Sequence, residues 1–384
     1  MVDTSARSAQ HNRNHLEGLT LTVTPRRSVA TVAIVAFVAL LAVACGSSTS
    51  SSSSSTTASS SNYSYAGLTG TLNGSGSTFQ KGFDEAAIAG FSDVAPKVTV
   101  NYAGGGSGKG KTDLATQVVQ WAGTDSLIKD ADIPTFKGGA VLYFPTVAAP
   151  ITVSFNLSGI DSVNLSASTL AKIFSAKITS WNDAAIAADN PDAMLPNTPI
   201  VVAHRSDGSG TTSNFTNYLK AAAGSDWTLD AGDTVNWPTN TQAGNGNTGV
   251  AQIVKATNGA IGYVDLSDAT ASNLTFASIK NKAGNFEQPT LAAASAAVAG
   301  AEIRPNLTYS ALNTSGVDAY PITAATYIIV YQKQSDAAIG NALKGWLNYV
   351  LTDGQGFAEG VDFATIPSSL AQQAIAQIGQ IQVG

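Results

Sequence analysis

Three short loops rich in glycine, serine and threonine carry the chemistry that is easiest to read from this sequence. They are Gly74–Phe79 (GSGSTF), Gly104–Gly108 (GGGSG) and Asp207–Thr212 (DGSGTT). Each precedes a segment with helical spacing of apolar residues, so each offers unpaired backbone N–H groups at a helix start, together with hydroxyl donors. Helix N-termini attract anions, and glycine lets the backbone approach a ligand closely. One such loop is usually a helix cap, but three in one chain predict an anion site.

Arginine usage points to the third loop. After residue 44 the chain has two arginines, Arg205 and Arg304, and Arg205 stands two residues before Asp207. A guanidinium offers a rigid fork of donors to an oxyanion. The alternative is an exposed Arg205–Asp207 pair of little energetic value. We favour a shared role, in which Asp207 holds the guanidinium and Arg205 contacts the ligand.

The elements that must position these loops alternate between strand and helix. Apolar runs and alternation predict strands near 98–102, 140–143, 151–155, 200–203, 260–264 and 327–331. Helical spacing of apolar residues occurs at 79–91, 114–121, 215–222, 343–350 and 370–378. Strands interleaved with helices of about 10–15 residues predict an α/β chain with mostly parallel sheets.

Length and composition limit the possible classes of protein. With 384 residues and 44% hydrophobic residues, the chain is globular material that suggests two packing units. Its formal charge of −6 argues against a nucleic-acid partner, which needs a basic surface. A single cysteine allows no internal disulfide. Since His204 is the one histidine after residue 44, we expect no multi-histidine metal site.

The first 44 residues have the pattern of an export signal. A polar segment ending in Arg26-Arg27 is followed by the apolar run 29–44, which stops at Cys45. These 16 residues are shorter than the roughly 20 that a membrane-spanning helix needs. The segment 42–46 (AVACG) resembles a bacterial lipobox, so we expect cleavage before a lipidated Cys45. Residues 45–64, mostly serine and threonine, then form a flexible tether.

Several motifs together resemble the phosphate-binding protein of bacterial phosphate ABC importers. The similarity covers nearly all of residues 68–384, and its most specific part is the RSDGSGT segment 205–211. The motifs that carry it are Ser77-Thr78-Phe79, Gly106-Ser107, Gly123-Thr124-Asp125, 143–147 (YFPTV), 178–182 (ITSWN), 205–211 (RSDGSGT), 259–263 (GAIGY) and 320–323 (YPIT).

The resemblance implies a two-lobed periplasmic-binding-protein fold of type II-like organisation. Each lobe would hold a mixed, mostly parallel sheet flanked by helices, and two crossovers near Val147 and Tyr320 would form the hinge. Lobe 1 would then comprise residues 65–147 and 319–384, and lobe 2 residues 148–318.

The resemblance also implies which residues contact phosphate. They are Thr78, Phe79 (through its backbone N–H), Ser107, Asp125, Arg205, Asp207, Ser209, Gly210 and Thr211. Two residues depart from the family pattern: Gln80 stands where proline is common, and Lys109 follows a loop that usually has only serine and glycine. Lys109 would add a cation at the mouth of the cleft.

Selectivity can be argued from the chemistry of the anions. Phosphate near neutral pH keeps at least one proton, whereas sulfate has none. A carboxylate such as Asp125 accepts a hydrogen bond from a P–O–H group but faces a bare oxygen of sulfate. A site built around a ligand hydroxyl can reject an analogue that lacks it by about 10⁴–10⁵. We therefore expect Asp125 to discriminate between the two, although a receptor for another tetrahedral oxyanion stays open as an alternative.

A P-loop is the rival interpretation. Residues 105–112 (GGSGKGKT) fit the pattern G-x-x-x-x-G-K-[ST], in which Lys111 and Thr112 would serve a nucleotide and magnesium. The export signal, the other anion loops and the lack of an evident apolar strand ending in a magnesium-binding aspartate argue against an NTPase.

We therefore expect a binding protein rather than an enzyme, without a cofactor or metal. It would capture inorganic phosphate and deliver it to a membrane ABC permease. We expect it to be exported, lipid-anchored to the outer face of the cytoplasmic membrane, and monomeric.

Overall fold

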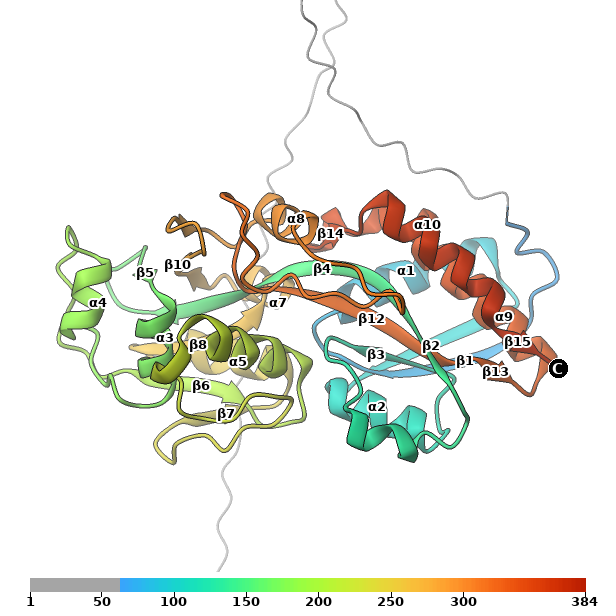
Figure 1. The fold of residues 1–384 in the computed structure, drawn as a ribbon, viewed down its shortest axis with the longest axis horizontal. Coiled ribbons are helices and arrows are strands. Elements are labelled where there is room, and N and C mark those ends of the chain that lie inside the picture. The colour runs from blue at the N-terminus through green and yellow to red at the C-terminus, as the bar shows by residue number, and fades with distance from the viewer. Residues whose placement is uncertain (1–62) are drawn as a thin grey trace, which may run out of the picture. The chain divides into compact units, whose positions relative to one another are not determined.

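A ten-stranded sheet runs through residues 63–384, the part of the chain that the computed structural model describes (Figure 1). The predicted signal peptide, Cys45 and all but the last residues of the tether lie outside the described residues. The strand order is β2-β1-β3-β12-β4-β8-β6-β7, and β14 and β9 also pair with β4. The ten strands are β1 (Gly70–Gly76), β2 (Val98–Gly104), β3 (Trp121–Thr124), β4 (Val141–Asn156), β6 (Val201–Arg205), β7 (Gln242–Gly244), β8 (Ala260–Asp265), β9 (Thr275–Phe276), β12 (Thr323–Tyr331) and β14 (Ala364–Thr365).

Strand β4 belongs to both halves of this sheet. Its residues 141–150 pair with β12, and its residues 151–156 pair with β8. The two strands predicted near 140–143 and 151–155 are therefore parts of one strand. Proline cannot donate to a ladder and is tolerated where pairing is irregular. Accordingly, Pro145 lies opposite Tyr327 beside a register shift in β12, and Pro150 lies where the partner of β4 changes.

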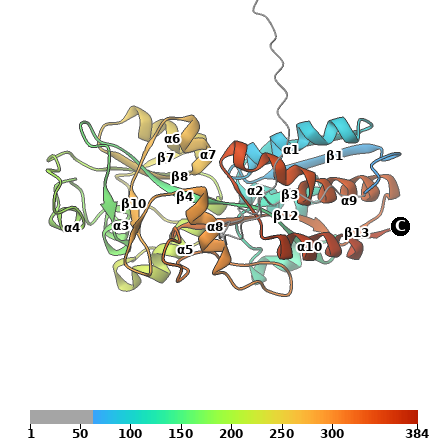
Figure 2. The same ribbon diagram turned by 90° about the horizontal axis from the view of Figure 1, so that it is seen from above.

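The pairing divides the described residues into two lobes, as expected. In lobe 1 the strands β2, β1 and β3 are parallel, and in lobe 2 the strands β8, β6 and β7 are parallel. Figure 2 shows α1, α2, α9 and α10 around the first set and α3 to α7 around the second. The exact lobe boundaries at 147/148 and 318/319 remain predictions. The helices are α1 (Lys81–Val94), α2 (Ser107–Ala115), α3 (Ala167–Phe174), α4 (Ala184–Asp189), α5 (Gly210–Ala222), α6 (Gly246–Ala256), α7 (Leu266–Ala271), α8 (Leu291–Ala299), α9 (Ala337–Leu351) and α10 (Ser368–Gln377).

Shorter elements complete the chain. Two further small sheets have the strand orders β11-β10-β5 and β13-β15. Their strands and the short 3₁₀ helices are β5 (Asn164–Leu165), β10 (Ser278–Lys280), β11 (Phe286–Glu287), β13 (Lys333–Gln334), β15 (Gln382–Val383), η1 (Asp130–Thr135), η2 (Gly224–Asp226), η3 (Asp353–Phe357), η4 (Glu359–Val361) and η5 (Ile378–Gln380). No helix within residues 63–384 is long and apolar enough to span a bilayer.

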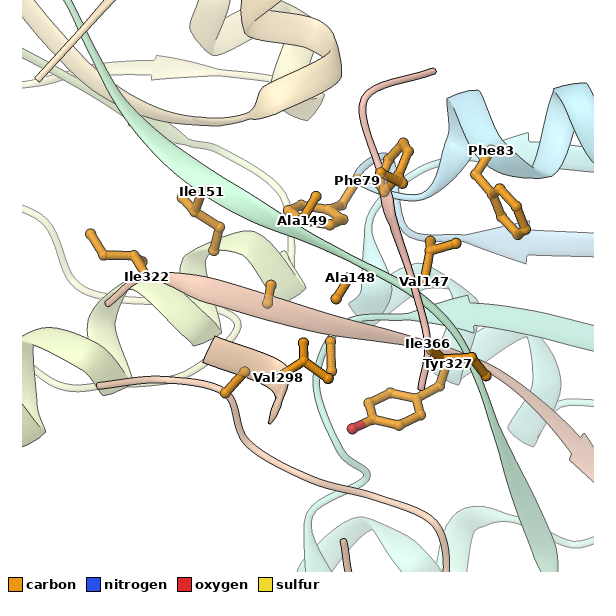
Figure 3. Packing of buried hydrophobic residues seen from close by; sticks show 14 of the residues in the cluster. Phe79, Phe83, Val147, Ala148, Ala149, Ile151, Val298, Ile322, Tyr327 and Ile366 are labelled. Atoms are coloured by element: carbon orange, nitrogen blue, oxygen red, sulfur yellow. The ribbon is translucent and has the colours of Figure 1, made fainter. Parts of the chain in front are cut away.

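The crossovers are held by apolar packing and by hydrogen bonds between the two connecting segments. Val147 to Ile151 of β4 lie beside Ile322 and β12 in a buried apolar cluster (Figure 3). The N–H of Ile151 donates to the Ile322 carbonyl at 2.8 Å, and the Tyr320 hydroxyl donates to the Ile151 carbonyl at 3.0 Å. The two crossovers are therefore adjacent and packed against each other.

One helix is shorter than its apolar spacing predicts. Helical spacing extends from Leu114 to Trp121, but α2 ends at Ala115 and Gln117 takes a positive φ of 61°. Trp121 instead begins β3, where it pairs opposite Gly74 of β1. Its buried indole stacks on Tyr102 with 4.9 Å between ring centroids, so the apolar character of Trp121 serves the core of the sheet.

This packing predicts that Gly74 tolerates no side chain. A Cβ at Gly74 would overlap the Trp121 indole, so Gly74→Ala is expected to lower the free energy of unfolding by about 1–3 kcal/mol. Gly356→Ala is the matched control, because a Cβ there meets nothing within 4 Å; it should change stability by less than about 0.5 kcal/mol. Urea unfolding of both variants measures the difference, and equal losses would contradict this account of the sheet.

Candidate functional site

The three predicted anion loops and the segment that holds Asp125 all follow the carboxyl ends of parallel strands. The loops after β1, β2 and β3 belong to lobe 1, and the loop after β6 belongs to lobe 2. Ligands of open α/β sheets bind at this edge, because the chain leaves each strand there as a loop that leads into a helix. The four segments therefore face one region between the lobes.

Asp125 is the centre of the lobe 1 contribution. Its side chain is 4% exposed, and its two oxygens accept hydrogen bonds from the Ser77 hydroxyl at 2.7 and 2.6 Å. The Ser107 hydroxyl donates to Asp125 Oδ2 at 3.2 Å, and the Asp125 N–H donates back to Ser107 Oγ at 3.1 Å. These bonds join the ends of β1 and β3 to the first residue of α2.

The surroundings of Asp125 make its protonation sensitive to pH. Burial raises the pKa of this carboxyl from its ordinary 3.8 to about 6, against hydrogen bonds from Ser77, Thr326 and Ser107 and the charge of Arg205, which lower it. Above pH 6 Asp125 is a buried hydrogen-bond acceptor, and below pH 6 it becomes a donor.

Arg205 and Asp207 form the charged pair of lobe 2, and the pair is largely removed from solvent, with 1% and 11% of the two side chains exposed. Arg205 is 4% exposed; its Nε donates to Asp207 Oδ1 at 2.8 Å, and its Nη2 donates to Asp207 Oδ2. The Gly246 N–H donates to the same Oδ1 at 3.0 Å. Burial raises the pKa of Asp207, but the hydrogen bond and charge of Arg205 outweigh it and hold this pKa below its ordinary value. The guanidinium is thereby fixed in one orientation.

Ser209, Gly210 and Thr211 begin α5 beside this pair. Ser209 caps the helix, since its hydroxyl accepts the Thr212 N–H at 3.1 Å. A Cβ at Gly210 would lie 2.6 Å from Asp125 Oδ2, so the start of α5 touches the lobe 1 cluster directly. Thr211 Oγ1 accepts a hydrogen bond from Arg205 Nη1 at 3.3 Å.

Asn247 is a site residue that the sequence reasoning missed. It is completely buried at the start of α6, and its side-chain oxygen accepts from Arg205 Nη1 at 3.3 Å. Its Nδ2 donates to Thr211 Oγ1 at 3.3 Å and to Thr78 Oγ1 of lobe 1 at 3.2 Å. The signal was present, because residues 244–249 (GNGNTG) form a fourth small-residue loop before a helix.

Thr78 and Phe79 complete the first loop. Thr78 reaches lobe 2 through Asn247, whereas the Phe79 N–H donates to Ser77 Oγ at 2.9 Å. The Phe79 ring is buried and packs edge-on against Phe363, with 5.8 Å between centroids. Phe79 therefore anchors the loop to the core of lobe 1, and its N–H is used within the loop.

The second loop also contacts lobe 2 through its backbone. Gly106 has φ +89°, and a Cβ there would overlap Asp207 Oδ2 and lie 2.5 Å from the Gly208 carbonyl oxygen. The Gly108 N–H donates to that same carbonyl at 2.9 Å. A positive φ and this close approach both require glycine at position 106.

Neither lysine of the P-loop-like segment points into the anion site. Lys111 makes an ion pair with Asp233 of lobe 2 at 2.7 Å and donates to Ser126 Oγ at 2.9 Å. Thr112 donates to the Gly108 carbonyl at 3.0 Å within α2. Lys109 pairs with Asp113 one helical turn away and is half exposed, so it adds no unpaired cation at the cleft mouth.

The arrangement suits an oxyanion that carries a proton. It combines one fixed guanidinium, hydroxyl groups and the N-termini of α2, α5 and α6 with the buried carboxylate acceptor of Asp125. Within residues 63–384 no group of three His, Cys, Asp or Glu side chains is placed to hold a metal ion.

Comparison with known proteins agrees with this geometry. Residues 50–354 match the family model of the PBP superfamily domain. The chain therefore belongs to the periplasmic-binding-protein superfamily.

Relatives narrow the class further. The chain is 36% identical over 305 residues to the phosphate-binding protein PstS of Methanocaldococcus jannaschii, covering 73% of this chain and 78% of that protein. It is 36% identical over 295 residues to PstS 3 of Mycobacterium tuberculosis, covering 74% and 80%. Within the superfamily, the chain belongs to the PstS phosphate-binding protein family, as its motifs predicted.

Solved structures share the fold. A high-affinity periplasmic phosphate-binding protein, PfluDING, solved with bound phosphate, superposes with a TM-score of 0.68 at 23% identity, covering 80% of this chain and 94% of that one. A putative phosphate ABC transporter substrate-binding protein from Clostridium perfringens, also with bound phosphate, gives 0.58 at 16% identity, covering 78% and 100%. The predicted two-lobed α/β fold is confirmed.

The pKa of Asp125 predicts a pH-dependent stability. Between about pH 4 and 6 the Asp125 carboxyl holds its proton more tightly in the folded protein than in the unfolded chain. The contribution of Asp125 to the free energy of unfolding therefore falls as pH rises through that window and is level above it. Asp125→Asn removes this fall, which amounts to about 3 kcal/mol at about 1.4 kcal/mol per pKa unit. Urea unfolding from pH 4 to 8 without ligand compares wild type, Asp125→Asn and the exposed control Asp192→Asn. Parallel curves for wild type and Asp125→Asn would disprove the assignment.

Proposed function

We propose that this protein captures inorganic phosphate outside the cytoplasmic membrane and delivers it to an ABC permease. The observation that carries the proposal is the buried Asp125 carboxylate among hydroxyl, amide and guanidinium donors of both lobes. Thr78, Ser107, Asp125, Arg205, Asp207, Ser209, Gly210 and Thr211 are the proposed phosphate site, together with Phe79, whose N–H would exchange its bond to Ser77 Oγ for one to a phosphate oxygen. Ser77 and Asn247 join it as residues that hold Asp125, Thr78 and Arg205 in position.

The proton of phosphate explains why an acidic side chain belongs in an anion site. Above pH 6 the ionised Asp125 accepts a hydrogen bond from the P–O–H group, and the donors around it bind the other oxygens. Sulfate has no proton to give, so it would leave two anionic oxygens opposed in a buried site. A site with this constraint rejects the analogue by about 10⁴–10⁵.

The setting of the protein follows from its family and its amino terminus. The relatives are binding proteins by name, and we propose binding without turnover, without a cofactor and without nucleic acid. The apolar run 29–44 followed by Cys45 supports export and a lipid anchor on the outer face of the cytoplasmic membrane. We propose a monomer, because one chain supplies both halves of the site.

The nucleotide alternative is not favoured. Lys111, which a P-loop would direct at phosphates, is paired with Asp233 and held by Ser126. Its ion pair joins α2 of lobe 1 to the segment before β7 of lobe 2, so Lys111 links the two lobes instead.

Asp125→Asn is predicted to reduce selectivity more than it reduces anion binding. The amide can donate to a bare sulfate oxygen, so sulfate affinity should rise at pH 8 while phosphate affinity falls, and the phosphate-to-sulfate ratio should drop by at least about a hundredfold. Calorimetric titration of both anions measures the ratio. An unchanged ratio would remove Asp125 from this role.

Asp207→Asn is the matched control for that measurement. It makes the same chemical change within the site, but Asp207 orients Arg205 and does not face the ligand proton. Both affinities should fall together, by about tenfold or more, with the ratio preserved.

Loss of the Lys111–Asp233 pair is predicted to speed phosphate release. The pair spans the lobes and is 13% and 14% exposed, so Lys111→Met should raise the dissociation rate about fivefold while leaving the association rate nearly unchanged. Lys109→Met is the control, because its partner Asp113 lies on the same helix. Stopped-flow measurement of both variants decides the point; an equal effect at the two lysines, or ATP hydrolysis by wild type that Lys111→Met abolishes, would contradict it.

A further inference from the structure

A line of buried polar side chains joins Asp125 to the start of α1 within lobe 1. Its members are Thr326 of β12, Gln80 immediately before α1 and Asp84 in the first turn of α1, and all three are completely buried. Residues of these types are usually exposed, and burying them is costly unless their polar atoms are bonded. The proposed phosphate site uses none of the three, so their contacts need an explanation.

Gln80 is the middle of this line. Its Nε2 donates to Asp84 Oδ2 at 3.0 Å, and its Oε1 accepts the Thr326 hydroxyl. A Cβ at Gly123, two residues before Asp125, would lie 2.4 Å from Gln80 Nε2, so the amide is packed against the end of β3. Proline, which is common at this position in the family pattern, has no side-chain amide to make these bonds. The line is therefore a feature of this chain.

Thr326 connects Gln80 to the carboxylate of the anion site. It lies at the register shift of β12, and its hydroxyl has one proton to give. Gln80 Oε1 accepts this proton, the Thr124 carbonyl lies 3.5 Å from the hydroxyl, and the same hydroxyl lowers the pKa of Asp125. Gln80 and Asp125 therefore compete for one donor, and each weakens the bond to the other.

Asp84 fixes the orientation of the Gln80 amide. Burial, and to a lesser extent the charges of Asp125 and Glu85, raise the pKa of Asp84 well above its ordinary value, against the hydrogen bond from Gln80. No donor among the described residues reaches Asp84 Oδ1, which costs less for a neutral acid than for a carboxylate. Asp84 thus acts as a neutral acceptor for Gln80 Nε2, and Gln80 Oε1 is left facing Thr326.

Other titratable groups also surround Asp125. They are Arg205 on β6, Asp84 on α1, Tyr102 on β2 and Asp265 at the end of β8, with Lys111 of α2 held nearby by Ser126 and Asp233. A substitution at Gln80 changes the charge of none of them. An effect of Gln80 on Asp125 can therefore be measured separately from theirs.

We propose that Gln80 is a positioning residue of the phosphate site: it draws the Thr326 proton away from Asp125 and so makes Asp125 a stronger acceptor for the ligand proton. Asp84 holds Gln80 in the orientation that does this. A carboxylate that receives weaker hydrogen bonds keeps more of its charge for the P–O–H group, and it also takes up a proton itself at a higher pH. The proposal rests on the proposed function, because Asp125 must face the ligand proton.

The pKa of Asp125 in the ligand-free protein tests the proposal directly. A ¹³C NMR titration of the aspartate carboxyls measures it, with the resonance assigned by its loss in Asp125→Asn. Gln80→Met removes the amide at similar volume, so Thr326 should turn its proton to Asp125, and the pKa should fall from about 6 by about one unit. Gln377→Met is the matched control, because Gln377 is a buried glutamine of lobe 1 that donates to the Tyr143 carbonyl at 2.7 Å; the pKa should not move.

Three further substitutions trace the path of the effect. In a Thr326→Val background Gln80→Met should no longer lower the pKa of Asp125, because no proton is left to redirect. Asp84→Leu frees the Gln80 amide and should lower the pKa of Asp125 as Gln80→Met does. Asp84→Asn keeps an acceptor for Gln80 Nε2 and should leave that pKa unchanged. Equal falls in Asp84→Leu and Asp84→Asn would assign the effect to the charge of Asp84 and overturn the proposal.

Sulfate binding gives the functional readout. Sulfate has no proton, so it binds best when Asp125 is protonated and donates. Sulfate affinity of wild type should rise about tenfold per pH unit as pH falls from 8 to about 6, and level off below it. In Gln80→Met the rise should continue about one unit lower, whereas Gln377→Met should follow wild type. Calorimetric titration of sulfate between pH 4.5 and 8 measures the three profiles.

The outcomes distinguish this inference from the proposed function. If wild type fails to bind inorganic phosphate at pH 8, the proposed function is wrong. If phosphate binds but the pKa of Asp125 in Gln80→Met stays the same or rises, this inference alone is overturned. It is also overturned if Gln80→Met lowers that pKa as much in the Thr326→Val background as in wild type, or if its sulfate profile coincides with that of Gln377→Met.

Discussion

The burial of the Arg205 guanidinium is the interaction on which the rest of the site depends. A charged group removed from water needs partners in fixed positions, and Arg205 finds them in Asp207, Thr211 and Asn247. Asp207 and Thr211 come from the connection between β6 and α5, and Asn247 comes from the start of α6, so the need to satisfy one side chain brings these two segments of lobe 2 together. Asn247 then links this cluster to lobe 1, because its Nδ2 donates a hydrogen bond to Thr78 Oγ1.

The two carboxylates of the site have opposite surroundings, and this gives them different tasks. Asp207 faces a cation, which holds its pKa below the ordinary value and keeps it ionised as a support. Asp125 faces hydroxyl groups in a buried position, where burial dominates and its pKa rises to about 6. Environments that push the pKa values of two like groups apart are the usual means by which one site assigns them separate roles. Asp207 orients the Arg205 donor, and Asp125 is the carboxylate that we propose contacts the ligand.

Much of this architecture was predictable, because local signals agree with the final structure. The glycine and serine loops stand at helix starts, and the segments near 98–102, 200–203 and 260–264 are strands. The continuity of β4 was hidden by Pro145 and Pro150, which lie at a bulge and at a change of partner.

Contacts between the two lobes could not be predicted from the sequence. Asn247 and the Lys111–Asp233 pair join segments that are far apart in sequence, and spacing carries no information on such pairs. The apolar spacing from Leu114 to Trp121 likewise matched a helix, although Trp121 begins β3. A buried aromatic residue fits the apolar pattern of a helix and that of a strand equally well.

The hinge limits the kind of motion that the lobes can make. β4 and β12 lie side by side as far as Pro150, and the backbone bond from Ile151 to Ile322 ties the two connections together. Two hydrogen-bonded strands resist sliding past each other but can flex together about one line. Opening and closing would then be a single rotation of one lobe relative to the other. A ligand that contacts either lobe would therefore act on the same angle between them. Recognition at the cleft and a change in the angle between the lobes would then be one event.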